Sequence, residues 1–324
     1  MRTPVPHRVA TTLITLVAPL VILGVAALVA VSWSDQLPDP VAVHWGTDGP
    51  DGFGSLASAI VPMLVVGALL AIGSWALAFL AGHASSTRRI AAGSSLGMSA
   101  LLAVILLGSL DAQRGLTDAT QAPGITTTLL VAIVAGLALG ALAAVVTPGD
   151  GDQPATQPIA ADAPRLTLGS TERAAWRRSA FSRTTLVVGI AAVLVVLVLT
   201  VVTRVWPLGL LALALAVLLL TMVAFDVSVD ERGLVARSLL GWPTLSVPLD
   251  EVVEAGVATV HPVKDFGGWG YRLGRGGRTG IVLRGGDALE VRRTGDRVAV
   301  ITVDDAATGA ALLNTLADRA RARR

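Results

Sequence analysis

The most regular feature of the chain is a set of long apolar stretches without Asp, Glu, Lys or Arg. An α-helix rises about 1.5 Å per residue, so about 20 apolar residues cross the roughly 30 Å hydrocarbon core of a bilayer. The third stretch opens with several Gly and Ser residues, which is typical of a helix packed closely against other helices. The pattern predicts six transmembrane helices, at Val9–Ser34, Leu56–Ala81, Ile90–Leu110, Ile125–Thr147, Thr184–Thr203 and Val205–Phe225.

A different pattern begins at Asp226, where short runs of Val, Leu and Ile alternate with Gly- and Asp-containing turns. Such runs are typical of antiparallel strands. A final helix, Asp304–Arg321, follows an Asp cap and carries Leu312, Leu313 and Leu316 on one face. We expect a small antiparallel barrel or sandwich closed by this helix. The predicted strands are Asp226–Asp230, Leu234–Leu240, Leu245–Pro248, Val252–Val260, Trp269–Leu273, Gly280–Arg284, Ala288–Arg293 and Val298–Val303.

These elements divide the chain into four parts. Residues 1–147 form a four-helix membrane unit, and residues 148–183 form a linker that opens with Pro, Gly, Asp and Ala. Residues 184–225 form a transmembrane helix pair, and residues 226–324 form the β-domain. The predicted fold class is an α-helical polytopic membrane protein with a small antiparallel β-domain and a C-terminal helix.

Arginine placement indicates how the chain is oriented in the membrane. Arg2 and Arg8 precede the first stretch, and Arg88 and Arg89 lie between the second and third. Five more lie between the fourth and fifth, namely Arg165, Arg173, Arg177, Arg178 and Arg183, whereas the alternate loops carry almost none. By the positive-inside rule, both termini and the β-domain are expected in the cytoplasm of a cell-membrane protein, and residues 35–55 outside.

The amino-acid composition limits which kinds of chemistry the protein can carry out. The 324 residues are 53% hydrophobic and 15% charged, whereas soluble domains carry about 25% charged residues. The mean hydropathy is +0.70, and the pI of about 9.9 reflects Arg in place of Lys, which gives no reason to expect a nucleic-acid partner. The chain has no cysteine, so disulfides and thiolate chemistry are excluded. It also has no His-Glu-x-x-His motif, and we expect neither enzymatic activity nor a cofactor.

Residues 37–55 read Leu-Pro-Asp-Pro-Val-Ala-Val-His-Trp-Gly-Thr-Asp-Gly-Pro-Asp-Gly-Phe-Gly-Ser. This segment resembles the signature loop of a bacterial membrane family, domain of unknown function 1648 (DUF1648), which occurs in SdpI-type immunity and signalling proteins. The resemblance covers roughly the first eighty residues, and it implies a role in immunity or signalling at the cell envelope.

A second resemblance lies in the C-terminal part. Asp265–Arg272, Gly280–Gly286 and Thr302–Asp305, with Leu166–Trp176 upstream, resemble the bacterial pleckstrin-homology-like domains of actinobacterial membrane proteins. The resemblance implies a small β-barrel with a C-terminal helix, which acts in binding or assembly and carries no known chemistry.

Three polar residues of the first loop, His44, Asp48 and Asp51, form a candidate ligand-binding site. The two Asp-Gly pairs are turn formers that can fold the carboxylates back toward the imidazole. One imidazole and two carboxylates suit a divalent metal or a small ligand. The same residues also suit a tight loop that caps the first two helices, so whether a metal binds stays open.

Arg272, Arg275 and Arg278 form a second candidate, in the glycine-rich segment Gly267–Gly280. Guanidinium groups and backbone amides can hold the phosphate of an anionic lipid. The alternative is a glycine-rich hairpin whose arginines are solvated. The arginines between residues 165 and 183 would likewise attract an anionic bilayer surface, or would serve only to mark topology.

These features favour a non-enzymatic membrane protein in envelope sensing, regulation or immunity. The loop would be its receptor element, and the β-domain would bind a protein partner beside the lipid bilayer. The alternative is a small-molecule or peptide transporter. Transporters commonly couple ions through ionisable residues inside the membrane, and the six stretches contain none. A membrane enzyme ranks below both for want of a nucleophile or an acid–base pair.

Overall fold

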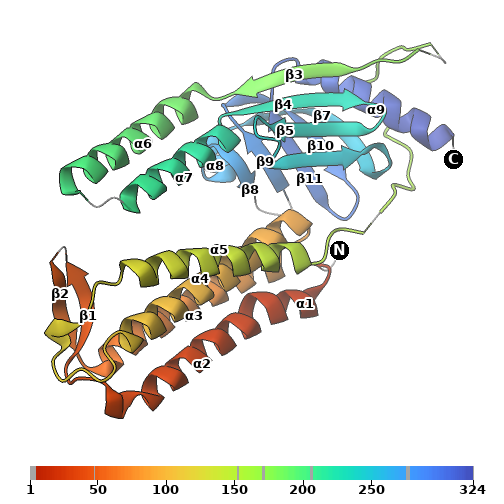
Figure 1. Cartoon of the computed structure of the whole chain (residues 1–324). Helices are drawn as coiled ribbons and strands as arrows, with labels where there is room; N and C mark the ends of the chain where they lie inside the picture. The colour runs from red at the N-terminus through yellow and green to blue at the C-terminus, as the bar shows by residue number, and fades with distance from the viewer. Residues whose placement is uncertain are drawn as a thin grey trace. The chain divides into compact units, whose positions relative to one another are not determined.

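A computed structural model of the chain describes residues 5–46, 48–151, 153–169, 172–204, 207–274 and 278–323. The chain forms two compact units, which meet in sequence between Asp150 and Gly151. The first unit consists of helices and a short β-hairpin, and the second consists of a helix pair and two β-sheets (Figure 1). Each unit has its own apolar core.

The first unit contains four long helices, and each is long and apolar enough to cross a membrane. This agrees with the first four predicted stretches. The first helix is continuous from Arg8 to Ser32 and includes a π-helical turn. The elements are α1 (Arg8–Thr12), η1 (Leu13–Val17), α2 (Ala18–Ser32), α3 (Leu56–Ala81), α4 (Ser85–Asp111) and α5 (Thr126–Val146).

Helices α4 and α5 cross at glycines. Gly93 and Gly97 of α4 face Gly136 and Gly140 of α5, and a Cβ atom on Gly97 would lie 2.7 Å from the carbonyl oxygen of Gly136. Small residues at a spacing of four let two helix backbones approach closely. The expectation that the small residues of the third stretch mark tight packing is confirmed.

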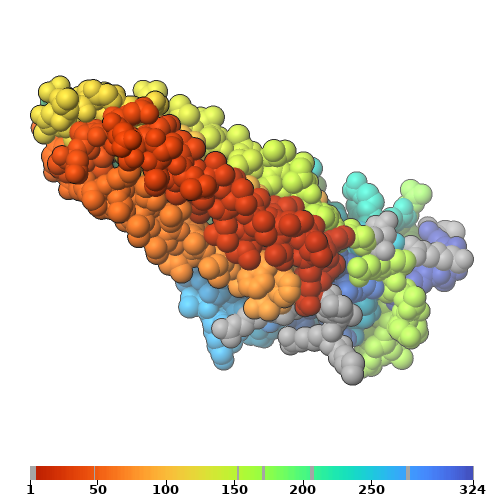
Figure 2. All heavy atoms as spheres, turned by 90° about the horizontal axis from the view of Figure 1, so that it is seen from below, coloured from red at the N-terminus to blue at the C-terminus, as the bar shows by residue number. Residues whose placement is uncertain are grey.

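A small β-hairpin lies between α2 and α3. A 3-10 turn, η2 (Ser34–Gln36), leads into β1 (Val41–Gly46), which pairs with β2 (Gly49–Gly54). The segment between α4 and α5 contains the short turn η3 (Ala119–Gln121), which contacts both strands. This segment is yellow in Figures 1 and 2, and it lies at the hairpin end of the first unit.

The second unit is a two-sheet sandwich with a helical hairpin. One sheet has the strand order β3-β4-β5-β6 and the other β7-β10-β11-β9-β8. Its elements are β3 (Trp176–Phe181), α6 (Arg183–Thr203), α7 (Pro207–Met222), β4 (Ala224–Asp230), β5 (Gly233–Ser238), β6 (Thr244–Pro248), η4 (Leu249–Glu251), β7 (Val252–Val260), α8 (Pro262–Phe266), β8 (Gly270–Leu273), β9 (Arg278–Val282), β10 (Gly286–Arg293), β11 (Arg297–Thr302) and α9 (Ala306–Ala322).

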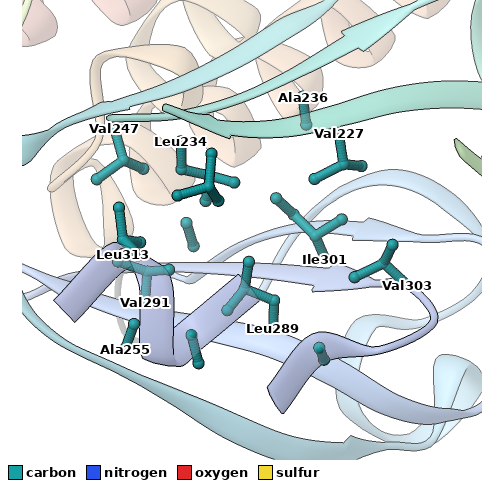
Figure 3. Close-up of a cluster of buried hydrophobic side chains, with 14 of the residues drawn as sticks. Val227, Leu234, Ala236, Val247, Ala255, Leu289, Val291, Ile301, Val303 and Leu313 are labelled. Atoms are coloured by element: carbon teal, nitrogen blue, oxygen red, sulfur yellow. The ribbon is translucent and has the colours of Figure 1, made fainter. Parts of the chain in front are cut away.

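The two sheets and α9 enclose one apolar core. Figure 3 shows side chains of the first sheet facing those of the second, with Leu313 of α9 among them. Leu312, Leu313 and Leu316 are all buried, as their helical spacing predicts. The core positions labelled in Figure 3 are Val227, Leu234, Ala236, Val247, Ala255, Leu289, Val291, Ile301, Val303 and Leu313.

The structure differs from the sequence prediction at residues 148–183, which were expected to form a linker. Strand β3 pairs with β4 over its whole length, and Trp176 is buried. Ile159 and Ala163 also belong to the core of the second unit. The difference arises because β3 is an edge strand with only Trp176 and Ala180 buried, so its sequence is too polar to stand out.

The sixth predicted stretch, Val205–Phe225, is divided between two elements. Helix α7 has 16 residues and ends at Met222, and strand β4 begins at Ala224. Phe225 is 1% exposed in the β core. Within the described ranges, five helices reach membrane-spanning length, with α6 as the fifth, and the apolar part of α7, Leu208–Met222, is shorter.

One strand pair departs from the expected all-antiparallel arrangement. Strands β9 and β11 pair in parallel, whereas β11 and β10 pair antiparallel. A parallel pair needs a crossover connection, and here β10 is that connection, on the other side of β11. Because the strands form two separate sheets, the sandwich is the one of the two expected forms that describes this part of the chain.

Candidate functional site

The β1–β2 hairpin brings His44 and Asp51 together. The Nδ1 atom of His44 lies 2.5 Å from Oδ1 of Asp51, and both side chains face solvent, with 72% and 54% of their surfaces exposed. A carboxylate at Nδ1 orients an imidazole and fixes which nitrogen carries its proton. The Nε2 edge of His44 is therefore oriented for a contact with another molecule.

Two glycines permit this pairing. His44 lies opposite Gly52 in the strand register, and a Cβ atom on Gly52 would lie 2.8 Å from the Cβ of His44. A Cβ atom on Gly46 would lie 2.6 Å from Oδ2 of Asp51. Side chains at either position would push the imidazole and the carboxylate apart.

Asp48, the third predicted ligand, stands apart from this pair. It lies in the turn between β1 and β2 and is exposed. Among the residues that the structure describes, no group of three His, Cys, Asp or Glu side chains is placed to hold a metal ion. The structure thus brings together two of the three predicted residues, as an exposed dyad.

A buried carboxamide fixes the hairpin to the helices. Gln113, which is 0% exposed, accepts a hydrogen bond from the Ala42 N–H at 2.6 Å and donates to the Ala42 carbonyl at 3.1 Å. It also donates to the carbonyl of Ser109, at 2.9 Å. Trp45 of β1 donates its Nε1–H to the carbonyl of Pro123, in the segment between α4 and α5, at 3.1 Å. These bonds make the hairpin a rigid cap on this end of the first unit.

One arginine, Arg114, adds further contacts at the same end. Arg114 donates to the side chain of Gln36 at 2.6 and 2.9 Å and pairs with Asp111 at 2.9 Å. Its guanidinium also lies 4.7 Å from the ring centroid of Trp33. The residues around the hairpin are therefore held by contacts from the α4–α5 segment and from η2.

At the opposite end of α4, a buried arginine closes the bundle. Arg88 is 0% exposed and pairs with Asp150 at 3.0 Å. It also donates to the carbonyls of Gly82, at 2.6 Å, and Pro148, at 3.1 Å. Asp150 in turn accepts two hydrogen bonds from Ser85. The sequence indicates Arg88 only as a marker of topology, whereas the structure gives it a bracing role.

The second candidate site is only partly assembled. Arg278 pairs with Glu290 at 3.0 Å and stacks on Phe266, with 5.2 Å to the ring centroid. Arg272 is exposed, and its Nε donates to the carbonyl of Trp269 at 2.6 Å. Arg275 lies outside the described residues. Arg278 is therefore neutralised by a carboxylate, and Arg272 keeps its charge available.

All four arginines between residues 165 and 178 are ion-paired within the second unit, and Arg173 pairs with Glu231 at 3.6 Å. Arg165 pairs with Asp318 at 2.7 Å, and Arg178 pairs with Asp305, also at 2.7 Å. Arg177 pairs with Asp226. These arginines, which in the sequence suggest contact with a membrane surface, thus form ion pairs that hold β3 and the preceding segment to the β-sandwich.

Comparison with known proteins supports the first resemblance. The profile of a family described as domain of unknown function 1648 matches residues 20–67, which span most of α2, the hairpin and the start of α3. No curated protein and no solved structure matches the chain.

Proposed function

We propose that the chain is a non-enzymatic integral membrane protein that acts in sensing, regulation or immunity at the cell envelope. The observation that carries the proposal is the exposed His44–Asp51 dyad, held on a hairpin that the buried Gln113 fixes to the helices. An oriented polar pair on a rigid, exposed cap is the arrangement expected of a recognition surface. The hairpin is the receptor element.

In this proposal the hairpin faces the outside, and both termini lie in the cytoplasm. The positive-inside distribution of arginine supports this orientation. The chain has no cysteine, so Asp48→Cys and Glu231→Cys each introduce a single reactive thiol. A membrane-impermeant maleimide should label the cysteine at position 48 in intact cells, and the cysteine at position 231 only after lysis. The reverse pattern would overturn the orientation.

The β-sandwich is the cytoplasmic interaction element, and a pleckstrin-homology-like domain is the assignment that its C-terminal helix supports. Its protein partner should co-purify with the detergent-solubilised full-length chain but not with a chain that ends at Asp150. The truncation is placed at Asp150 because β3 and the segment before it pack in the sandwich.

Photo-crosslinking tests the receptor role directly. Phe53 is 41% exposed on β2, so benzoyl-phenylalanine at this position reports on molecules that touch the hairpin. We expect a discrete adduct that disappears in His44→Ala and Asp51→Asn. The matched control places the same probe at Leu137, which is 70% exposed on α5 and should give no protein adduct.

A transporter would give a different result. If the Phe53 probe captures nothing and vesicles containing the protein show a flux that depends on the proton-motive force, the receptor proposal fails in favour of transport.

A further inference from the structure

A groove of about 360 Å³ runs along one side of the α6–α7 hairpin where it joins the sandwich. Its walls are apolar and come from both helices, including Val188, Ala192, Leu215 and Leu218. Trp269 and Arg272, which lie just before and within β8, line the end of the groove next to the sandwich, which is its mouth. An apolar channel with a cationic mouth matches a molecule with an apolar chain and an anionic head.

The charge at the mouth is available to a ligand. Only the Nε of Arg272 is occupied, by the carbonyl of Trp269. Among the described residues, no carboxylate pairs with Arg272, whereas nearby Arg278 is paired with Glu290. The two Nη groups of Arg272 can therefore donate to a phosphate, which guanidinium binds in a bidentate manner.

The groove lies at the depth of a lipid headgroup and the upper part of its chains. Helix α6 begins at Arg183, and the groove residues on α6 run from Thr184 to Ala192. At about 1.5 Å per residue, they cover roughly the first 12 Å of the helix. One leaflet contributes about 15 Å of hydrocarbon, so the groove spans one leaflet next to the sandwich.

A second surface places the membrane boundary at the same level. Leu239, Leu240 and Trp242 are 64%, 54% and 73% exposed in the β5–β6 turn. Strand register puts this turn at the end of the sheet from which the helices leave, since Phe225 pairs with Ser238 and lies three residues after α7. Exposed Trp and Leu residues beside a membrane helix are typical of the headgroup region.

We propose that this groove binds one anionic phospholipid of the adjacent leaflet. One acyl chain lies between α6 and α7, and the phosphate lies on the Nη groups of Arg272 beside Trp269. The inference rests on the membrane placement of α6 and α7 and not on the receptor role of the hairpin, so the crosslinking test of the receptor and the test below can fail independently.

Native mass spectrometry of the full-length, delipidated protein tests the proposal. The probes are phosphatidylglycerol and phosphatidylcholine with identical acyl chains, each titrated in detergent. We expect wild type to retain one phosphatidylglycerol in preference to phosphatidylcholine. Arg272→Ala should weaken phosphatidylglycerol binding at least about tenfold, because it removes the charge-assisted hydrogen bonds to the phosphate.

Two further variants separate the groove from its mouth. Ala192→Phe fills the groove from an exposed position of α6, and it should abolish retention of either lipid while leaving Arg272 intact. Arg232→Ala is the control, because Arg232 is highly exposed at the opposite end of the sheet, and it should bind as wild type does.

Three outcomes would overturn the proposal. The first is equal retention of the two lipids by wild type, and the second is undiminished phosphatidylglycerol binding in both Arg272→Ala and Ala192→Phe. The third is a change of oligomeric state in Ala192→Phe with lipid binding unchanged, which would assign the groove to a second copy of the chain.

Discussion

The side chain of Asn314 offers a sharp test of how α9 closes the sandwich. Asn314 is 0% exposed and makes three hydrogen bonds. It accepts from the Ala255 N–H at 2.8 Å and donates to the Ala255 carbonyl at 2.8 Å. Its third bond, at 3.0 Å, goes to the carbonyl of Pro164. Ala255 lies on β7, an edge strand, so the carboxamide takes the place of the next strand.

Asn314→Ala should destabilise the sandwich by about 3–5 kcal/mol. The estimate follows from two buried backbone groups of Ala255 left without partners, at about 1–3 kcal/mol each, with a smaller loss at Pro164. Urea unfolding of the full-length protein in proteoliposomes, followed by pulse proteolysis of the sandwich, measures the effect. With a urea dependence of about 2 kcal/mol per M, the midpoint should fall by roughly 1.5–2.5 M.

Two companion variants isolate the hydrogen bonds. Ala307→Asn, at an exposed position of the same helix, measures the intrinsic preference of a helix for Ala over Asn, which is below about 1 kcal/mol. Asn314→Asp keeps the acceptor for Ala255 N–H but loses both donors, so it should be at least as unstable as Asn314→Ala at neutral pH. If Asn314→Ala shifts the midpoint no more than Ala307→Asn does, these bonds do not hold the helix.

Three further results are expected. Gly97→Val should separate α4 from α5 and lower the thermal stability of the first unit in detergent by an amount equivalent to about 1–3 kcal/mol, whereas Gly24→Val, where a Cβ meets nothing within 4 Å, should change it little. Leu312→Asp places a charge in the core and should make the sandwich protease-sensitive in inside-out vesicles while the membrane helices stay inserted; unchanged resistance would contradict the role of α9. The pKa of Asp305 is lowered, chiefly by the hydrogen bond from Thr308 and next by that from Trp176. The ionised Asp305 carboxylate therefore stabilises the sandwich above its unfolded pKa of about 3.8, and this stabilisation is lost as the pH falls through the lower folded pKa. Asp305→Asn should accordingly weaken the acid dependence of sandwich unfolding. An unaltered acid dependence would refute this role of Asp305.

Elements with a strong periodic or continuous pattern were predictable from the sequence. The second apolar stretch and the strand Val252–Val260 have the same bounds in the structure. The eight predicted strands after residue 225 all form, and no strand end differs from the prediction by more than two residues. Here the local pattern dominates, because each element buries a regular set of apolar positions.

Boundaries between two apolar elements were not predictable from hydropathy. The sequence stays apolar from α7 into β4, so the change from helix to strand near Val223 leaves no mark in hydropathy. Only the alternation of Phe225, Val227 and Val229, all buried, identifies the strand. Strand β3 was not predicted for the opposite reason, because the residues between Trp176 and Ala180 are polar and exposed.

The candidate site was predictable where turn chemistry determines it. The Asp-Gly turn beside His44 brings Asp51 within hydrogen-bonding distance, as expected. The residues that support the site were missed, since a single Gln or Arg carries no signal in the sequence. Gln113 and Arg88 become recognisable only when segments 71 and 62 residues distant come together.

The position of the α6–α7 hairpin between two paired strands constrains how the protein is made. Phe181 pairs with Ala224, so a helical hairpin of 42 residues takes the place of a turn between neighbouring strands. The ribosome delivers β3 before the hairpin and β4 after it, so these two strands cannot pair until the whole hairpin has been synthesised. A force that tilts either helix would act directly on the β3–β4 pair at its base.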